Sequence, residues 1–360
     1  MTRTGHRDTP GAEGDAADGP VDGPADVVAL GESMVAFLPT RPGRLADVPS
    51  FDRSIGGAES NVVCALAAAG HRTRWVGRVG ADGFGDHLLA AIGAWGVDVS
   101  AVRRDPGRPT GVYFRTAGDR GTDAHEVAYY RAGSAASAMS PHSVDLAAAR
   151  SGRILHLSGI TAALSADCLG LLRELTAPRP GRPLISFDVN HRPGLWGDGT
   201  DPRVLLELAR GADLVFVGED EAQHAWGVEG GPDAIRALLP EPALLVVKEG
   251  AAGATVLDHD TAVSRPALHV DVVATTGAGD AFAAGFLSAT LRNLPLGDRA
   301  RHGHLWAAAA LTAPGDLAAP PARDTADRLA ALPEDAWGRL RLGPGWTQAE
   351  QRAEEEVPTP

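Results

Sequence analysis

Two glycines and an aspartate stand together in the stretch from Thr275 to Phe286, which reads Thr-Thr-Gly-Ala-Gly-Asp-Ala-Phe-Ala-Ala-Gly-Phe. Glycine lets the backbone turn freely, so the amides of Gly277, Ala278 and Gly279 can point at one place. The apolar run after Asp280 predicts a buried helix, whose first amides lack partners and favour an anion. A carboxylate beside an anion site is useful if it accepts the proton of an attacking hydroxyl. We therefore expect phosphoryl transfer.

An ordinary helix start uses the same residue types. An aspartate in the first turn offsets the helix dipole and caps free amides, and Gly-x-Gly is common in turns. The stretch by itself leaves both interpretations open, and the remainder of the chain has to discriminate between them.

Charge and composition limit the classes of protein that this chain can belong to. The 33 basic and 46 acidic residues give a net charge of -13, which argues against a non-specific binder of nucleic acid or anionic membranes. With 360 residues, 44% of them hydrophobic, the chain can fill a sizeable core. Cys64 and Cys168 each lie in a predicted helix, with no disulfide framework or metal-ligand spacing. We expect a reduced, cytoplasmic protein.

The two ends of the chain differ from its middle. Residues 1–25 are rich in Gly, Asp, Pro and Ala without an apolar segment, which predicts a disordered tail and not a signal peptide. No stretch approaches the ~18 apolar residues of a membrane helix. We expect one folded body over residues 26–316. The C-terminal extension, residues 317–360, is expected to be partly disordered, with a helix over 325–332.

Short β-branched runs alternate with helical patterns over most of the chain. The predicted strands include residues 26–30, 74–79, 154–158, 184–189, 214–217, 244–248, 254–257 and 269–273. Repeated strand–helix–strand units predict a mostly parallel sheet with helices on both faces. Ligands of such sheets lie beyond the carboxyl ends of the strands. Asn190, Arg192 and Gly250 follow directly after predicted strands, and the Gly277 turn follows the last one.

A second pair of glycines, Gly56 and Gly57, precedes a small-residue helix over residues 62–69. Paired glycines let a ligand approach the backbone, and the amide of Asn61 offers a donor and an acceptor to a hydroxylated ligand. A plain junction between a loop and a helix remains the alternative.

Two strand-like runs, residues 110–114 and 126–131, interrupt the alternation and are predicted to pair antiparallel. They contain the three tyrosines of the chain, Tyr113, Tyr129 and Tyr130, followed by Arg131. An aromatic ring packs on a sugar ring, while a phenol and a guanidinium bind hydroxyls or a carboxylate. Ordinary cross-strand packing is the alternative.

The two glycine motifs, Gly56-Gly-Ala-Glu-Ser-Asn61 and Thr275-Thr-Gly-Ala-Gly-Asp280, resemble in order and spacing the two signatures of ribokinase-like (PfkB-type) carbohydrate kinases. The likeness runs from about Asp26 to Asp316. Several segments are most similar to 2-keto-3-deoxygluconate kinases, namely residues 110–114, 129–137, 155–160 and 187–196. The resemblance implies an α/β fold, a ribokinase-like three-layer α/β/α sandwich with a mostly parallel central sheet. A small β-strand lid is expected from about residues 34–55 and 110–131.

The resemblance also implies a role for each matching residue on the sugar side. Asp280 is expected to deprotonate the sugar hydroxyl, and the amides of Gly277, Ala278 and Gly279 to bind the transferred phosphoryl group. Arg131 and Arg192 are placed to meet a substrate carboxylate. The other residues expected to line the sugar pocket are Gly56, Gly57, Asn61, Tyr113, Tyr129 and Asp316.

On the nucleotide side, the resemblance implies ATP and Mg2+ as cofactors. Residues 248–253 look like the nucleotide loop, and Glu221 matches the acidic member of the family's Asn-x-x-Glu motif near magnesium. The residues expected around the nucleotide are Asn190, Lys248, Gly250, Gly253, Gly277, Gly279 and His304.

Two positions depart from the family pattern. Gly218 replaces the Asn of Asn-x-x-Glu, which removes a polar side chain from the magnesium region. Ala274 replaces an Asp that helps to hold a monovalent cation in relatives, which makes activation by potassium doubtful.

We interpret the chain as an ATP-dependent kinase that phosphorylates a primary hydroxyl of a small sugar acid, 2-keto-3-deoxygluconate. The alternatives are a kinase for a neutral sugar, fructose or ribose, and a sugar-binding regulator that has lost turnover, which Gly218 and Ala274 motivate. A dinucleotide oxidoreductase fits less well, because Gly31-Glu-Ser after the first strand is not Gly-x-Gly-x-x-Gly. We expect a small-molecule substrate, no nucleic-acid or membrane partner, and, by analogy with relatives, a homodimer joined through the lid.

Overall fold

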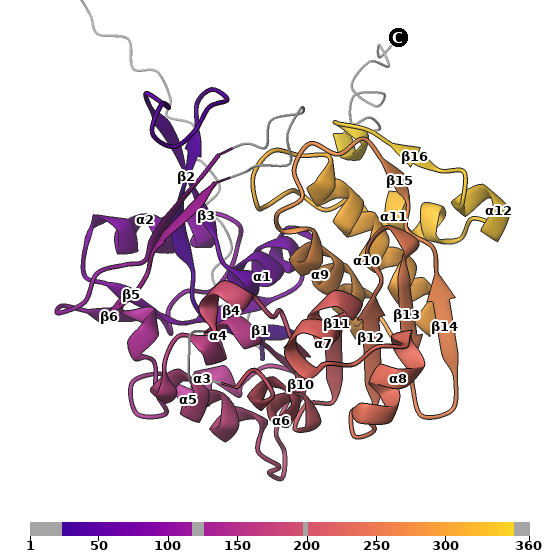
Figure 1. Ribbon diagram of the computed structural model, residues 1–360, viewed down its shortest axis with the longest axis horizontal. Coiled ribbons are helices and arrows are strands. Elements are labelled where there is room, and N and C mark those ends of the chain that lie inside the picture. The colour runs from indigo at the N-terminus through magenta and orange to yellow at the C-terminus, as the bar shows by residue number, and fades with distance from the viewer. Residues whose placement is uncertain (1–23, 117–125, 197–200, 349–360) are drawn as a thin grey trace, which may run out of the picture.

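An eight-stranded sheet forms the centre of the protein in its computed structural model, which describes residues 24–116, 126–196 and 201–348 (Figure 1). The strand order is β14-β13-β12-β11-β10-β9-β1-β4. The six neighbouring strands from β12 to β4 in this order are parallel, and β13 and β14 pair antiparallel. The bounds are β1 (Val27–Leu30), β4 (Thr73–Val76), β9 (Ile154–Ser158), β10 (Leu184–Asp188), β11 (Leu214–Gly218), β12 (Leu244–Lys248), β13 (Ala254–Leu257) and β14 (Ala262–Arg265).

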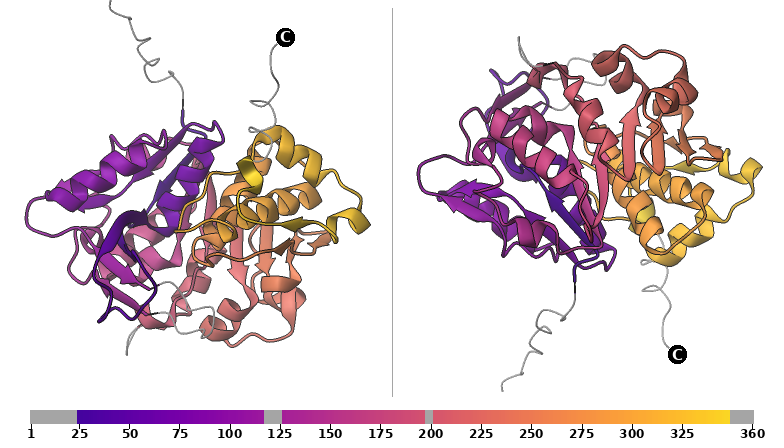
Figure 2. Two further views of the ribbon diagram at one scale, coloured as in Figure 1. Left: turned by 90° about the horizontal axis from the view of Figure 1, so that it is seen from above. Right: turned by 90° about the horizontal axis from the view of Figure 1, so that it is seen from below.

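Helices cover both faces of this sheet, as the turned views show (Figure 2). Alternate residues of one strand enter different cores: Val27 and Ala29 pack on one face, and Val28 and Leu30 on the other. One face is covered by α1 (Ala58–Ala68), α2 (Gly83–Gly93), α9 (Ala278–Leu291), α10 (Leu296–Leu311), α11 (Arg323–Ala330) and α12 (Glu334–Trp337). The other is covered by α3 (Leu146–Ala149), α4 (Gly159–Ala163), α5 (Ala166–Thr176), α6 (Val204–Arg210), α7 (Glu219–Trp226) and α8 (Gly231–Leu238). The predicted three-layer sandwich is confirmed.

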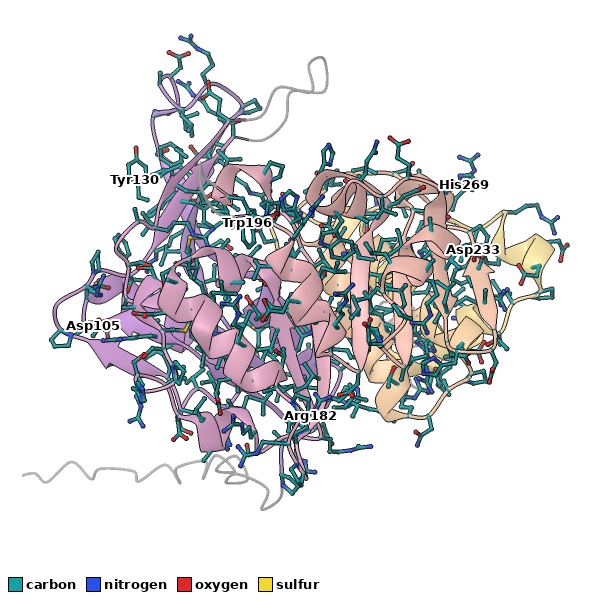
Figure 3. The ribbon with its side chains drawn as sticks, turned by 60° about the horizontal axis from the view of Figure 1, so that its bottom comes forward. Asp105, Tyr130, Arg182, Trp196, Asp233 and His269 are labelled. Atoms are coloured by element: carbon teal, nitrogen blue, oxygen red, sulfur yellow. The ribbon has the colours of Figure 1, made fainter. Side chains whose placement is uncertain are left out.

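A second, four-stranded sheet rises beside the sandwich and is called the lid sheet here (Figure 1). Its order is β3 (Phe51–Gly56), β2 (Met34–Pro39), β7 (Val112–Arg115) and β8 (Val127–Tyr130). Strands β7 and β8 pair antiparallel, as predicted. Tyr113 is buried, whereas Tyr130 is 67% exposed and projects from the sheet in Figure 3. On the same face as Tyr130, Val35 and Phe37 of β2 pack against the main core, so this face is covered at its centre and exposed at the edge strand β8.

Two predicted strands differ in the structure. The run 74–79 divides at Gly77, where an added Cβ would meet the Gly31 carbonyl, into β4 and β5 (Arg78–Gly80); β5 pairs with β6 (Arg103–Asp105). The strand predicted at 269–273 does not belong to the central sheet, so this prediction was wrong. Only β15 (His269–Val270) forms there, paired with β16 (Arg341–Leu342), because β14 occupies the edge that it would have joined.

The C-terminal extension contributes to the main core. The ring of Trp337 is fully buried, and its Nε1 donates to the Pro266 carbonyl at 3.0 Å. The guanidinium of Arg301 lies over the same ring, 4.9 Å from its centroid. The predicted boundary at residue 316 stays a prediction, and the tails at 1–23 and 349–360 lie outside the described residues. In the described part of the chain, no helix has both the length and the apolar character to cross a membrane.

We predict that Trp337→Ala lowers the free energy of unfolding by about 3–5 kcal/mol, because it removes a buried ring and leaves a cavity. Urea unfolding followed by circular dichroism measures this change. Tyr130→Ala, at an exposed position of edge strand β8, is the control and should change stability by less than about 0.5 kcal/mol. An equally small effect of Trp337→Ala would contradict the packing described here.

Candidate active site

The backbone at the start of α9 forms a turn that only glycine fits. Gly277 precedes the helix with φ of 80°. A Cβ at this position would also lie 2.1 Å from the carbonyl oxygen of Asp316. Among the residues that the structure describes, no side chain caps the first amides of α9. The turn, consisting of Thr276 to Gly279 and called the phosphate turn below, thus presents unpaired amides, which suit a bound anion.

Asp280 lies in the first turn of α9, where Asn61 of α1 contacts it. The Nδ2 of Asn61 donates a hydrogen bond of 2.8 Å to Oδ2 of Asp280. The Oδ1 of Asn61 is buried and has no hydrogen-bond partner among the described residues. The two sequence motifs, 219 residues apart at these positions, therefore meet at one point.

The protein surrounding Asp280 makes its carboxyl a better base than an ordinary aspartate. Its side chain is only partly exposed, and burial raises its pKa from 3.8 to about 7. The hydrogen bond from Asn61 opposes this rise, and the negative charge of Asp188 adds to it. A carboxyl with a pKa near 7 can accept a proton at neutral pH.

A cluster of alternating charges lies beside the phosphate turn, at the carboxyl ends of β10 and β12. The amine of Lys248 lies 3.1 Å from Asp188 Oδ1 and 3.9 Å from Glu221 Oε2. Arg192 donates to Glu221 Oε1 at 3.0 Å. A Cβ at Gly279 would lie 3.8 Å from the Lys248 amine, which places this cation next to the phosphate turn.

These contacts keep Lys248 and Glu221 charged. Burial disfavours the ammonium of Lys248, but the charges of Asp188 and Glu221 outweigh it and raise its pKa. Burial likewise opposes the charge on Glu221, yet Lys248, the Gly218 amide and Arg192 hold its pKa low. The backbone amide of Gly218 donates to Glu221 Oε2 at 2.8 Å. The residue that departs from the family pattern therefore still binds this carboxylate, through its backbone.

Aromatic and polar side chains connect the lid sheet to the phosphate turn. The hydroxyl of Tyr113 donates to Oδ2 of Asp316, and the Tyr113 and Tyr129 rings lie 5.6 Å apart. A Cβ at Gly56 would collide with both the Tyr113 hydroxyl and the Asp316 carboxylate, so the close approach requires glycine. The expected sugar-side residues of the lid and of the Gly56 motif thus gather in one region.

Arg131 lies next to this aromatic pair, with its guanidinium carbon 5.7 Å from the centroid of the Tyr129 ring. It forms an ion pair with Glu32, which is buried and also accepts a hydrogen bond from Ser134 at 3.1 Å. The Nε of Arg131 is buried without a hydrogen-bond partner among the described residues. This guanidinium therefore retains a donor for a ligand.

The residues expected around the nucleotide are less closely gathered. Asn190 follows β10 with φ of 40°, and its Oδ1 is buried without a described partner. Gly250 and Gly253 have φ of 58° and 133°, which favours glycine at both positions. His304 is buried and contacts the Arg265 carbonyl through Nε2 at 3.1 Å. Its expected contact with the nucleotide stays a prediction.

Several side chains of this region were absent from the sequence prediction. Asp188 ends a buried strand just before Asn190, and that position could have identified it. Glu32 and Arg115 gave weaker signals, because their partners Arg131 and Asp316 are distant in sequence. Glu59 is buried in α1 and accepts hydrogen bonds from Ser158 and Thr161 at 2.8 and 2.7 Å.

A separate cavity of about 370 Å³ lies near the other end of α9. Its wall includes Ser288, Arg292 and His302, and none of the residues expected to bind the sugar or nucleotide. It is not part of the site described above.

The chain is similar to known carbohydrate kinases in sequence and in fold. Residues 24–323 match the pfkB family carbohydrate kinases. A 2-dehydro-3-deoxygluconokinase of Thermoproteus tenax is 36% identical over 282 residues, which cover 77% of this chain and 86% of the relative. A probable chloroplastic fructokinase of Arabidopsis thaliana is 32% identical, covering 78% of this chain and 74% of the relative. Among solved structures, a sugar kinase of Pyrococcus horikoshii in complex with ATP superposes with a TM-score of 0.73 at 24% identity, covering 86% of this chain and 99% of that one.

We predict that Asp280→Asn stabilises the fold at pH 8 and has its smallest effect near pH 4. The unfolded carboxyl ionises near its ordinary pKa of 3.8, but the folded one ionises near 7. Between these values rising pH therefore costs folding free energy, and the cost is complete above about pH 7. Asparagine removes the ionisation and still accepts from Asn61. Urea unfolding at several pH values measures the difference. Asp52→Asn, at an exposed lid position, is the control, and a pH-independent difference for Asp280→Asn would contradict the raised pKa.

Proposed function

This chain belongs to the pfkB family of carbohydrate kinases, and we propose that it transfers the γ-phosphoryl group of ATP to a primary hydroxyl of 2-keto-3-deoxygluconate, a small sugar acid also called 2-dehydro-3-deoxygluconate. One observation carries the reaction. The carboxyl of Asp280, held by Asn61, stands in the same helical turn as the unpaired amides of the phosphate turn. The base for the acceptor hydroxyl and the anion site for the transferred phosphoryl group are therefore adjacent.

In the proposed reaction, Asp280 accepts the proton of the acceptor hydroxyl while that oxygen attacks the γ-phosphorus. The bond from phosphorus to the β-phosphate oxygen breaks, ADP leaves with the electron pair, and the proton stays on Asp280 until it passes to solvent. The amides of Gly277, Ala278 and Gly279 bind the oxygens of the transferred group. Lys248 adds a positive charge beside them. Positioning and charge neutralisation account for most of such a step.

Asp188 and Glu221 are the residues that would hold Mg2+. The described residues include no cluster of three or more His, Cys, Asp or Glu side chains able to enclose a metal. Mg2+ usually keeps several waters and binds through one or two carboxylates and the phosphates of its substrate, so this pair fits it. When bound, Mg2+ would neutralise charge on the phosphates. The amine of Lys248 contacts both carboxylates.

The sugar-acid assignment is supported by Arg131 and by the 2-dehydro-3-deoxygluconokinase relative. The buried Nε of Arg131 has no partner among the described residues and lies beside the Tyr129 ring. A carboxylate that accepts this donor gains a charge-assisted hydrogen bond, which a neutral hydroxyl matches less well. We assign the sugar carboxylate to Arg131, with Arg192 as the second cation.

A neutral sugar such as fructose is the second candidate, and the ion pairs favour it. Arg131 is already paired with Glu32, and Arg192 with Glu221, so neither guanidinium brings an uncompensated charge to the site. A carboxylate substrate has to share each guanidinium with a resident acid. The similarity to a probable fructokinase supports the same candidate.

We predict that Asp280→Asn lowers kcat on the order of 10²- to 10⁴-fold, the usual contribution of a positioned base, and leaves sugar binding within about threefold. A coupled ATPase assay gives kcat, and isothermal titration gives the dissociation constant. The kcat/KM of the wild type should fall as pH decreases below about 7, where Asp280 becomes protonated. Near-normal turnover of Asp280→Asn would exclude its role as the base.

We predict that 2-keto-3-deoxygluconate gives a kcat/KM at least about tenfold above that of fructose or ribose. Arg131→Met should remove this preference, because the carboxylate of the sugar acid loses its ion pair with Arg131, whereas a neutral sugar has no such pair to lose. A coupled assay over sugars and sugar acids, with and without potassium, measures both. A preference for fructose in the wild type would establish the second candidate instead.

A further inference from the structure

We propose that the cavity of about 370 Å³ at the far end of α9, called the end cavity below, is a second binding site, and that it takes a small organic anion. The ligand has a carboxylate or phosphate head on a flat apolar body. The volume of the cavity lies in the range of ~300–1,000 Å³ that is usual for small-molecule sites. The proposal goes beyond the kinase activity and does not depend on which sugar the enzyme uses.

The end cavity and the kinase site lie at opposite ends of the same two helices. Asn61 and Asp280 stand near the starts of α1 and α9. Ala68, at the end of α1, and Ser288 and Arg292, at the end of α9, line the end cavity. From Asp280 to Arg292, α9 rises on the order of 15–20 Å, at about 1.5 Å per residue. A ligand in the end cavity therefore leaves the kinase site free.

The charged side chains in the wall of the end cavity are both positive. They are Arg292 of α9 and Arg323 of α11, which lies beside α10 (Figure 1), and no aspartate or glutamate of the described residues lines the cavity. Arg323 is exposed and has no ion-pair partner in the described part of the chain. In a chain with 46 acidic and 33 basic residues, a wall with two arginines and no acid favours an anion.

Arg292 is held in place and still has donors to offer. Its Nη2 donates to Oδ2 of Asp327 at 2.7 Å, and Asp327 does not line the cavity. Its Nε and Nη1 have no acceptor among the described residues. A guanidinium presents its donors as a planar fork that matches the oxygens of a carboxylate or a phosphate. The ion pair therefore directs Arg292 without using all of its hydrogen bonds.

Two histidines contribute neutral groups near the same wall. His302 lines the cavity, and burial lowers its pKa. The Nε2 of His71 lies 2.8 Å from the Ser288 hydroxyl. Burial lowers the pKa of His71 as well, and the charges of Arg323 and Arg292 lower it further, although a nearby aspartate opposes the shift. The positive charge of the end cavity thus comes from its two arginines, and both act at the Ser288 wall.

The rest of the wall is largely apolar. Pro320 and Pro321 precede α11, Ala326 lies in its first turns, and the largely buried Trp306 belongs to α10. An indole ring packs well against a flat apolar group. Two cations beside such a surface suit a ligand with an anionic head and an apolar body better than a bare inorganic ion.

The first test measures binding to the full chain by isothermal titration in a phosphate-free buffer. The probes are benzoate, phenyl phosphate and their neutral counterpart benzamide. We expect at least one anion to bind with a stoichiometry of one, a Kd at or below about 1 mM and at least about tenfold higher affinity than benzamide. The tighter anion identifies the head group. A saturating non-hydrolysable ATP analogue should leave this Kd within about threefold. Failure of both anions to bind, equal binding of benzamide, or displacement by the analogue would overturn the proposal.

The second test places the bound anion with variants. Arg323→Met should weaken binding of the tighter anion at least about tenfold, because it removes the uncompensated cation. Arg339→Met is the matched control, since Arg339 is an exposed arginine outside the cavity wall, and should leave the Kd unchanged. Ala326→Leu puts a larger side chain into the cavity and should abolish binding, with circular dichroism to check its fold.

An unchanged Kd in Arg323→Met, or full binding by folded Ala326→Leu, would show that the anion binds elsewhere and would refute the end cavity as its site. If Ala326→Leu does not fold, Arg323→Met decides, because that side chain lies on the surface. None of these measurements uses turnover. A failure of the sugar-acid assignment would therefore leave their results unchanged.

Discussion

The hydrogen bond from Asn61 to Asp280 joins the N-terminal ends of α1 and α9, and the remaining site is arranged around it. It forms because both helices consist largely of small residues and can approach each other closely. On its other side, α9 is fixed by α10: a Cβ at Gly285 would lie 2.5 Å from the His302 carbonyl, and one at Gly303 would meet the Phe282 ring. Close helix packing, and not a rigid loop, thus sets the direction of the Asp280 carboxyl.

Charge pairing is the second constraint on the site. Arg115, Arg131 and Arg192 each hold a resident carboxylate, and Lys248 lies between two. Buried charges without partners are costly, so each cation of the site is paired with a carboxylate of the protein. These cations also place positive charge where phosphates would bind, in a chain whose net charge is -13. The same pairing bears on substrate choice. A sugar acid competes with Glu32 or Glu221 for a guanidinium, whereas a neutral sugar adds hydrogen bonds and no net charge.

The strand–helix alternation, the lid strands and both glycine motifs could be predicted from the sequence, because each depends on local patterns. Periodicity distinguishes buried strands from helices, and glycine pairs mark turns that other residues cannot adopt. Strand β14 and the place of residues 269–273 could not, because strand order at the edge of a sheet depends on which segment packs there. Nor did the sequence indicate that Trp337, within the predicted extension 317–360, lies in the main core. A single buried aromatic residue in a polar segment carries no periodic signal.

The chain by itself determined which chemical groups are present: a base, a glycine turn with free amides, a sugar-side amide and a set of arginines. These follow from residue types at short spacing, where backbone geometry leaves few alternatives. Only the tertiary structure decided which acid each cation holds, that Arg115 reaches Thr276 and Asp316, and that burial raises the pKa of Asp280 to about 7. Those features depend on distances between residues far apart in the chain and on the exclusion of water between them, and both arise only when the helices and sheets pack together.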